Sequence, residues 1–272
     1  MIFVPTLSFI AMGCSEPAFD SGDKEEIQEP QEIENIEKLF DVPEGPFDLA
    51  LHPEDNRIFV SGNASGKLYS WDHSELREEV GDYDDIQAIA FVESEFYYTI
   101  TDNGVTGALV RGLGNDGQVV MTQSSDGTLI RWPTDIVVTP SGDILMADFN
   151  AGVVFSISPN EESTIHTVGS VSPETLCWLD GHLYIGGEDG IWRKEWPDGI
   201  ASQIDTRPAL ALEVVNRQVY AANSSDGLFP IGGDAMLLSE LARPGSLLFA
   251  SDVLYIVDRI GRGVWASRFE ED

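Results

Sequence analysis

The chain has 272 residues, of which 42% are apolar, so it can bury a substantial core. It carries 47 acidic and 15 basic residues, a formal net charge of −32, and so acidic a surface repels phosphate-rich partners. We therefore expect no nucleic-acid partner. The length is compatible with one repeat-built domain or two small ones, of which we expect the first.

The chain opens on an apolar run that ends in a cysteine. Residues 2–14 read IFVPTLSFIAMGC, which is shorter than the roughly 20 apolar residues that span a bilayer. The last four letters resemble the lipobox of a bacterial lipoprotein, although alanine stands where leucine is usual and no Lys or Arg precedes the run. We predict a lipoprotein signal peptide over residues 1–13 and lipid attachment at Cys14. A general secretory signal or a mis-set start codon is the alternative.

Residues 14–38 form an acidic segment rich in Glu, Asp, Gln, Ser and Pro. This composition cannot bury enough apolar area to offset the entropy of ordering, so it predicts a flexible tether. A lipid anchor followed by a tether places the protein in a bacterial cell envelope, and Ser15 after the cysteine favours the outer membrane. Near the end of the tether, Ile33, Ile36 and Phe40 stand at near-helical spacing, so a short helix competes with a strand there.

Six similar units follow. Each has an apolar strand, a polar turn, a second apolar strand, and then a loop and a third strand. The second strands read RIFVSG, EFYYTIT, DILMAD, HLYIGG, QVYAAN and VLYIVD, and such runs of Val, Ile, Leu, Tyr and Phe between Gly, Asp and Asn are typical of strands and their turns. The six units begin at Pro46, Ile86, Pro133, Pro173, Pro208 and Pro244.

A period of about 40 residues with three or four strands per unit predicts an all-β, six-bladed β-propeller over residues 39–272. The strands are apolar on both faces, as expected where a neighbouring sheet covers each side. The last unit lacks an outer strand, while EKLFDVP near the start belongs to no unit. We predict that this N-terminal strand completes the last blade and removes an open sheet edge. Cys177, within TLCWL, is expected to be a buried core residue.

Two of the units carry a family resemblance. The third, RWPTDIVVTPSGDILMADF, resembles the recurring pattern of the gluconolactonase/regucalcin (senescence marker protein) family of six-bladed propellers. The first, EGPFDLALHPEDNRIFV, is similar to that family's opening Glu-Gly-Pro motif. NHL-type propellers have similar sequence patterns, so the resemblance identifies a superfamily. It covers all six units loosely and two of them well.

The resemblance implies lactonase activity at a divalent cation, such as Ca²⁺, in the central channel. In the family the cation is held by the Glu of the Glu-Gly-Pro motif and by an Asn and an Asp in two later turns. Glu44 matches the first ligand and Glu174 stands at the second, but Ala209 occupies the third and offers no oxygen. Thr134 replaces the Asn of an Asn-Asp pair. Because Ca²⁺ prefers six or more oxygens, the matched set is incomplete, and no cofactor is firmly predicted.

The residues that enter each inner strand share one rim of the channel, the entrance rim, with the loops between the second and third strands. Asp135 is the candidate general base on this rim. None of the four histidines is expected there, which leaves histidine-based catalysis without support. The remaining Asp and Asn residues of the rim are expected to accept backbone hydrogen bonds in tight turns. The predicted ligand-binding residues are Trp132, Arg131, Thr134, Arg207, Arg243 and Asp148.

Two functions from different classes fit these patterns. Because the metal ligands are incomplete, we expect a lipid-anchored, monomeric envelope protein whose entrance rim binds a small molecule or an envelope protein without catalysis. The alternative is a metal-dependent hydrolase of a lactone or similar ester, with Glu44 and Glu174 as metal ligands and Asp135 as base. A purely structural assembly module is a third interpretation.

Overall fold

The structure is a computed structural model. The predicted signal peptide, the lipidation residue Cys14 and most of the predicted tether lie outside the residues that it describes. No helix in the described ranges has the length and apolar character needed to cross a membrane. The described residues are 33–62, 66–79, 85–102, 104–159, 162–167, 172–234 and 241–269.

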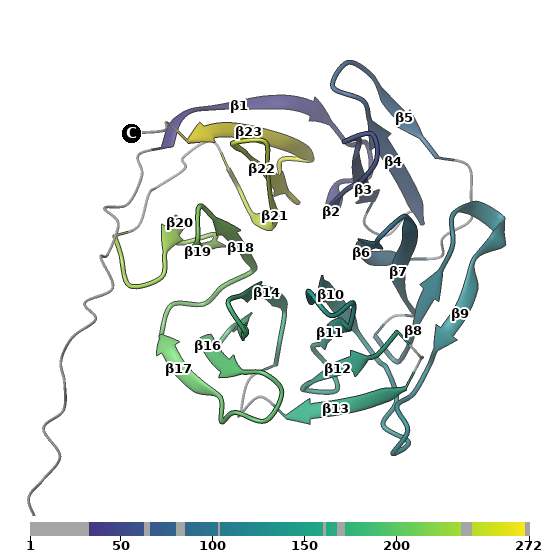
Figure 1. Cartoon of the computed structure of the whole chain (residues 1–272). Helices are drawn as coiled ribbons and strands as arrows, with labels where there is room; N and C mark the ends of the chain where they lie inside the picture. Colours follow the sequence, from purple (N-terminus) through teal and green to yellow (C-terminus); the bar gives the residue numbers. More distant parts are fainter. Residues whose placement is uncertain are drawn as a thin grey trace, which may run out of the picture. The chain divides into compact units, whose positions relative to one another are not determined.

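Six antiparallel sheets stand around a central channel, which confirms the predicted six-bladed β-propeller (Figure 1). Four inner strands begin at the residue expected from the repeat, while those of blades four and five begin at Thr175 and Ala211, a few residues later than expected. The inner strands are β2 (Pro46–Leu51), β6 (Ile86–Val92), β10 (Pro133–Val138), β14 (Thr175–Leu179), β18 (Ala211–Val215) and β21 (Pro244–Ala250).

The second strand of each blade is formed by the apolar run that the repeat predicted. Every residue of the second strands in blades one and three is buried, because a neighbouring sheet covers each face. These strands are β3 (Ile58–Gly62), β7 (Glu95–Asp102), β11 (Ile144–Asp148), β15 (His182–Gly187), β19 (Gln218–Asn223) and β22 (Val253–Asp258).

The outermost strands are less buried and more polar than the others. A short 3-10 helix, η1 (Gly114–Asp116), links two of them, and the fifth blade has three strands among the described residues. The third strands are β4 (Lys67–Trp71), β8 (Thr106–Arg111), β12 (Val153–Ile157), β16 (Gly190–Glu195), β20 (Gly227–Pro230) and β23 (Gly263–Phe269). The outer strands are β5 (Leu76–Glu78), β9 (Gln118–Met121), β13 (Ser163–Thr167), β17 (Ser202–Asp205) and β1 (Ile33–Asp41).

The N-terminal strand closes the ring, as predicted. β1 pairs antiparallel with β23, from Ile33 opposite Phe269 to Asp41 opposite Gly263 (Figure 1). The alternative of a helix in this segment is wrong. β1 also begins within the predicted tether, because pairing with β23 satisfies backbone groups that an acidic segment alone leaves to water.

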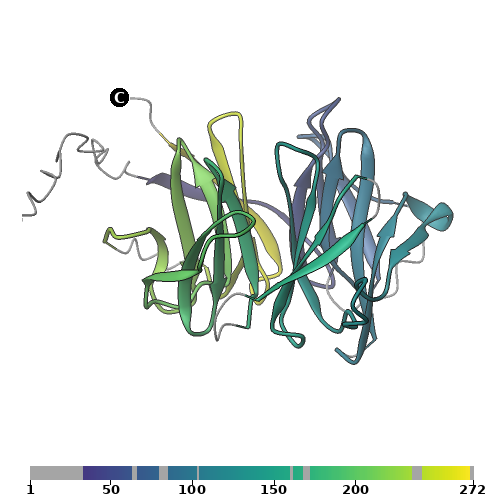
Figure 2. The ribbon, with the colours of Figure 1, turned by 60° about the horizontal axis from the view of Figure 1, so that its bottom comes forward.

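Hydrophobic clusters between neighbouring sheets hold the blades together. In the tilted view of Figure 2 the sheets stand beside one another, with the hairpin turns at the two ends. Phe59 of β3 and Phe96 of β7 belong to one such cluster, and Cys177 and Phe229 to another. Cys177 is a free, buried thiol whose pKa is raised by burial, which confirms its predicted place in the core.

Candidate functional site

The inner strands present a free edge to the channel, and acidic side chains satisfy part of it. The Oδ2 atom of Asp48 in β2 accepts a hydrogen bond from the backbone N–H of Ile89 in β6, at 2.8 Å. Its Oδ1 atom accepts one from the hydroxyl of Ser246 in β21, at 2.7 Å. Asp48 therefore ties blade one to both of its neighbours, and burial raises its pKa.

Asp135, the predicted general base, has a similar set of contacts. Its Oδ2 atom accepts hydrogen bonds from the N–H of Leu176 at 2.6 Å and from the hydroxyl of Thr175 at 2.9 Å. Its Oδ1 atom accepts one from the N–H of Ile136 at 2.7 Å. Burial, followed by the negative charge of Asp48, raises the pKa of Asp135 to about 8. Both oxygens are engaged with protein donors, so the geometry supports a link between blades three and four more than a role as base.

A second level of the channel holds an acidic residue that the sequence analysis did not single out. The ladder registers give Ala211 in β18 the position that Asp135 has in β10, and Glu213 lies two residues further along. Its Oε1 atom accepts a hydrogen bond from the N–H of Val214 at 2.7 Å, and its carboxyl group also accepts one from the N–H of Phe249 in the neighbouring strand β21. Burial, aided by the charge of Asp48, raises the pKa of Glu213 to about 7. The signal was present as one Glu in the apolar run ALALEVV.

Glu213 lines a cavity of about 470 Å³ at the end of the channel where the inner strands finish. All six inner strands contribute to its wall. Apart from Glu213 its deeper wall is apolar, so water and dissolved ions screen a charge there less than they do at the surface. The apolar residues at the level of Glu213 are Ala50, Ala90, Val137, Cys177 and Leu248.

At the opposite end of the channel, the entrance rim, the predicted metal ligands do not assemble. The Oε2 atom of Glu44 accepts a hydrogen bond from the Tyr69 hydroxyl, and its Oε1 atom lies 3.6 Å from Lys67 Nζ. The hydrogen bond from Tyr69 is the main reason that the pKa of Glu44 is lowered. Glu44 is thus engaged with β4, on the third strand of its blade.

Two other positions implied by the family resemblance, Thr134 and Ala209, offer no free oxygen. The Thr134 hydroxyl donates to the carbonyl of Pro173 at 3.3 Å, and Ala209 is fully buried. In the part of the chain that the structure describes, no three His, Cys, Asp or Glu side chains come together as a metal ion requires. The residues present do not fit a Ca²⁺ site, which needs six or more oxygens.

Three predicted ligand-binding residues cluster in the third blade. Asp148 is fully buried, and its carboxylate accepts backbone hydrogen bonds from Arg131 at 2.7 Å, Trp132 at 3.1 Å and Ala151 at 2.8 Å. Those bonds fix the entry to β10 and leave Asp148 little capacity for a ligand. Trp132 is 39% exposed and packs edge-on against Phe149, with ring centroids 5.9 Å apart. The aromatic ring and the exposed Arg131 side chain are therefore available at the rim.

The arginines of the entrance rim differ in their partners. Arg207 binds Asp205 through Nε and Nη2, donates Nη1 to the Gly233 carbonyl at 3.0 Å, and lies 3.9 Å from the ring centroid of Phe229. Its charge is therefore matched within blades four and five. Arg243 is exposed at the start of the sixth blade. Arg259, which the predicted ligand-binding set did not include, stacks on Phe47 of β2 and interacts electrostatically with Glu174 and Asp135 of other blades, which places it at the mouth of the channel.

Comparison with known proteins places the fold. No protein-family model and no curated protein matched the sequence. Among solved structures, a proposed gluconolactonase from a structural genomics programme is similar at 15% identity and a TM-score of 0.72, covering 89% of this chain and 93% of that chain. A gluconolactonase from Xanthomonas campestris is similar at 13% identity and a TM-score of 0.68, covering 86% and 89%. A streptogramin B lyase is similar at 11% identity and a TM-score of 0.58, covering 87% and 98%.

These likenesses span nearly the whole propeller in each case. Identities this low establish shared architecture and do not transfer an activity. The chain is a six-bladed β-propeller, closed by its N-terminal strand, that is structurally similar to proteins of the gluconolactonase family.

Proposed function

We propose that the protein is a hydrolase of a small cyclic ester, with Glu213 as the acid–base group in the channel cavity. The observation that carries the proposal is a single carboxyl group, with its pKa raised to about 7, in a cavity of about 470 Å³ whose other side chains are nearly all apolar. A group with a pKa near the working pH is present in both protonation states, which general acid–base catalysis requires.

The reaction follows from that placement. The Glu213 carboxylate takes a proton from a water molecule as the water oxygen forms a bond to the ester carbon. The bond between that carbon and the ring oxygen then breaks, and Glu213 returns the proton to the leaving oxygen. The product is a hydroxy acid. No step is assigned to a metal ion, because the donor set at the entrance rim does not fit one.

The comparisons support an enzyme more than a purely structural protein. Proteins named as a gluconolactonase and a lyase share this architecture over most of their length. The hydrolase departs from the family resemblance in one respect, since the carboxyl group acts at the cavity end of the channel and the family's metal ligands map to the entrance rim.

The second candidate is a binding protein without catalysis, which is favoured by the dispersal of the predicted metal ligands at the entrance rim. Both candidates are compatible with an envelope protein anchored at Cys14. That localisation is tested by labelling cells with a radioactive fatty acid. Label that survives Cys14→Ala, or no label on the wild-type protein, would contradict the anchor.

The hydrolase is tested by acid release from a panel of five- and six-membered lactones, followed at constant pH. Glu213→Gln should lower kcat/KM by about 100-fold or more, because it removes the general base. Glu54→Gln, an exposed residue in the β2–β3 turn at the same end of the channel, is the matched control and should retain the wild-type rate. A Glu213→Gln protein that folds and keeps the wild-type rate rules out this mechanism. If no lactone is hydrolysed, the binding interpretation is preferred.

A further inference from the structure

At the mouth of the channel, neighbouring residues hold the side chain of Arg259 in a fixed position. The guanidinium carbon of Arg259 lies 3.8 Å from the ring centroid of Phe47, and its Nη2 atom donates to the carbonyl of Gly245 at 2.8 Å. A Cβ atom at position 245 would lie 2.1 Å from Arg259 Nε, so only glycine leaves room for this side chain. The aromatic ring and the glycine together fix the guanidinium in the mouth.

The charge of Arg259 is not neutralised by a direct contact. Its Nε atom is buried without a hydrogen-bond partner. Across the described ranges, neither Arg259 nor Arg243 forms an ion pair with a carboxylate. Burial, followed by the positive charge of Arg243, lowers the pKa of Arg259 to about 10, so Arg259 remains charged at neutral pH. A buried charge without a close counter-charge is costly, which makes this arrangement unusual unless a ligand completes it.

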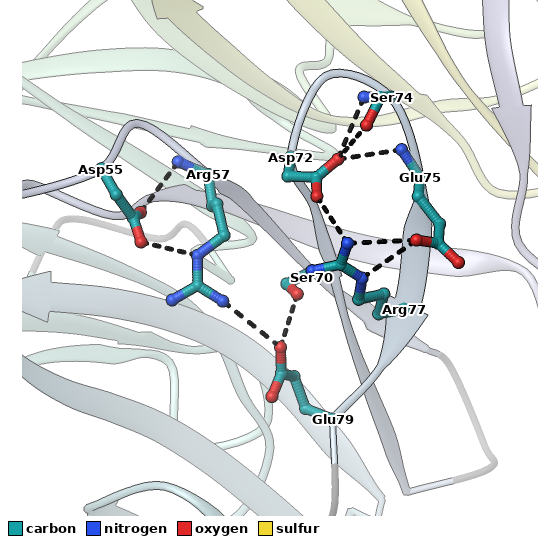
Figure 3. Close-up of polar contacts among 8 residues, drawn as sticks. All are labelled: Asp55, Arg57, Ser70, Asp72, Ser74, Glu75, Arg77 and Glu79. Carbon is teal, nitrogen blue, oxygen red and sulfur yellow. Dashed lines mark hydrogen bonds and ion pairs between the residues drawn. The ribbon is translucent and has the colours of Figure 1, made fainter.

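Arginines elsewhere in the molecule show what a completed contact looks like. In blade one, Arg57 Nε lies 2.7 Å from Asp55 Oδ2, and Arg77 Nη2 lies 2.9 Å from Asp72 Oδ2 and 3.1 Å from Glu75 Oε2 (Figure 3). With 47 acidic and 15 basic residues, the chain has ample carboxylates with which to pair its arginines. Exposed arginines such as Arg131 and Arg193 also lack an ion pair within the described residues, and Arg259 differs from them because its Nε atom is buried.

The backbone that carries Arg243 is also fixed. The buried carboxylate of Asp258 accepts hydrogen bonds from the N–H groups of Ala242 at 2.9 Å, Arg243 at 3.0 Å and Gly261 at 2.9 Å. Asp258 ends β22 and immediately precedes Arg259. One buried side chain thus holds together the two segments that present both arginines.

A carboxylate lies close to these cations without touching them. Glu174 is half-buried, and burial raises its pKa. The positive charges of Arg259 and Arg243 reduce this upward shift. The negative charge of the Glu174 carboxylate repels a doubly charged anion more than a singly charged one. It can, however, accept a hydrogen bond from a hydroxyl group of a singly charged one.

We propose that the channel mouth binds a small hydroxy carboxylate, whose carboxylate lies between Arg259 and Arg243 and whose hydroxyl group donates to Glu174. Two guanidinium groups present the planar donor geometry that a carboxylate or a phosphate matches, and Glu174 favours the former. This site lies at the opposite end of the channel from Glu213. The proposal of an anion site therefore does not depend on whether the cavity hydrolyses esters.

The proposal is tested by isothermal titration calorimetry of the purified full chain at low ionic strength. The probes are D-gluconate, neutral D-sorbitol and inorganic phosphate. Gluconate should bind with a dissociation constant in the millimolar range or lower, and its affinity should fall as salt is added. Phosphate should bind more weakly than gluconate, and sorbitol should give no signal. The proposal is overturned if neither gluconate nor phosphate binds at millimolar concentration. It is also overturned if phosphate binds more tightly than gluconate.

Variants locate the site. Arg243→Gln should weaken gluconate binding by about tenfold or more without loss of folding, because the side chain is exposed. Arg77→Gln, which removes an arginine that is already paired, should bind as wild type. Glu213→Gln should also bind as wild type, which separates this site from the proposed hydrolase. Equal binding by Arg243→Gln and wild type, or equal weakening by Arg77→Gln, contradicts the assignment.

Discussion

The two ends of the channel are built on the same six strands and have opposite chemistry. The entrance rim carries Arg243 and Arg259 near the Glu174 carboxylate, whereas the cavity end carries Glu213 among mostly apolar side chains. The same six inner strands form both ends of the channel. The difference between the ends therefore lies in the side chains that these strands and their entry loops present. We therefore propose two separate sites, one for an anion and one for acid–base chemistry.

Between these ends lies a level of the channel with a structural role. Asp48 and Asp135 occupy equivalent positions in β2 and β10 and accept N–H groups from the next blade's inner strand. An inner strand has no neighbour on its channel side, so its N–H groups need such partners. The following changes test whether this level and the two ends are independent.

The largest expected effect is on stability, from Asp48→Ala. The substitution leaves the Ile89 N–H and the Ser246 hydroxyl without their partner, at a cost of about 2–4 kcal/mol in the free energy of unfolding. Urea denaturation measures it, with Glu54→Ala in an exposed turn as control. A change below about 0.5 kcal/mol, as is usual for surface sites, would mean that Asp48 does not link the blades.

Stability should also depend on pH, with a sign set by the channel carboxyls. Asp135 and Glu213 have pKa values raised to about 8 and 7, so the folded protein keeps protons that the unfolded chain has already released. Their contribution is complete below the unfolded pKa of about 4 and is lost as the pH rises through the folded values.

Unfolding free energies at pH 8 and pH 5.5 check this expectation. The protein should be more stable at pH 5.5, by on the order of 1–2 kcal/mol, and Asp135→Asn should reduce the difference. The trend reverses in stronger acid, where groups with lowered pKa values such as Asp72, at about 2, lose their contribution. Stability that rises steadily from pH 5.5 to 8 would show that the buried carboxyls do not titrate in this window.

A change at the entrance rim alone should be smaller. Gly245→Ala places a methyl group against Arg259 Nε and displaces the guanidinium. Gluconate affinity should fall by about tenfold, or about 1.4 kcal/mol, while lactone hydrolysis is retained. Gly152→Ala, where the added carbon meets nothing within 4 Å, serves as control, and its φ of 68° makes it the more strained of the two backbone positions. Unchanged affinity in Gly245→Ala would separate Arg259 from the anion site.

The smallest effect is expected from Thr175→Val. The Thr175 hydroxyl donates to Asp135 and accepts the N–H of Leu212 at 3.0 Å, so it relays the contact from blade three to blade five. Its removal should cost about 1 kcal/mol in the free energy of unfolding and leave both ligand sites intact. Thermal unfolding of Thr175→Val beside Thr175→Ser, which keeps the hydroxyl, measures the hydroxyl's part. Equal losses in the two variants would assign the effect to packing.

The fold was predictable from the sequence because its signals are local and repeated. Apolar runs at a period of about 40 residues identified six blades, and the unassigned segment EKLFDVP, residues 37–43, identified the closure by the strand that the structure places at Ile33–Asp41. The start of β1 was not predictable to the residue, because its order comes from pairing with β23 and not from its own acidic composition.

The candidate sites were less predictable because they depend on where side chains point. The resemblance placed Glu44 at the channel, but Tyr69 and Lys67 engage it at β4. Asp135 was expected as a base, and three protein donors occupy it. Glu213 and Arg259 are single charged residues whose importance follows from burial, which emerges only when the six strands converge.

The proposed acid–base role of Glu213 depends directly on the pH at which its carboxyl group ionises. The pKa values of glutamate side chains are measured by following the carboxyl carbon signals of ¹³C-labelled protein in an NMR titration. One glutamate should titrate near pH 7, and its signal should be absent from Glu213→Gln. If the Glu213 signal instead titrates near its ordinary value of about 4.3, the carboxyl is solvated as at a surface and the acid–base role fails.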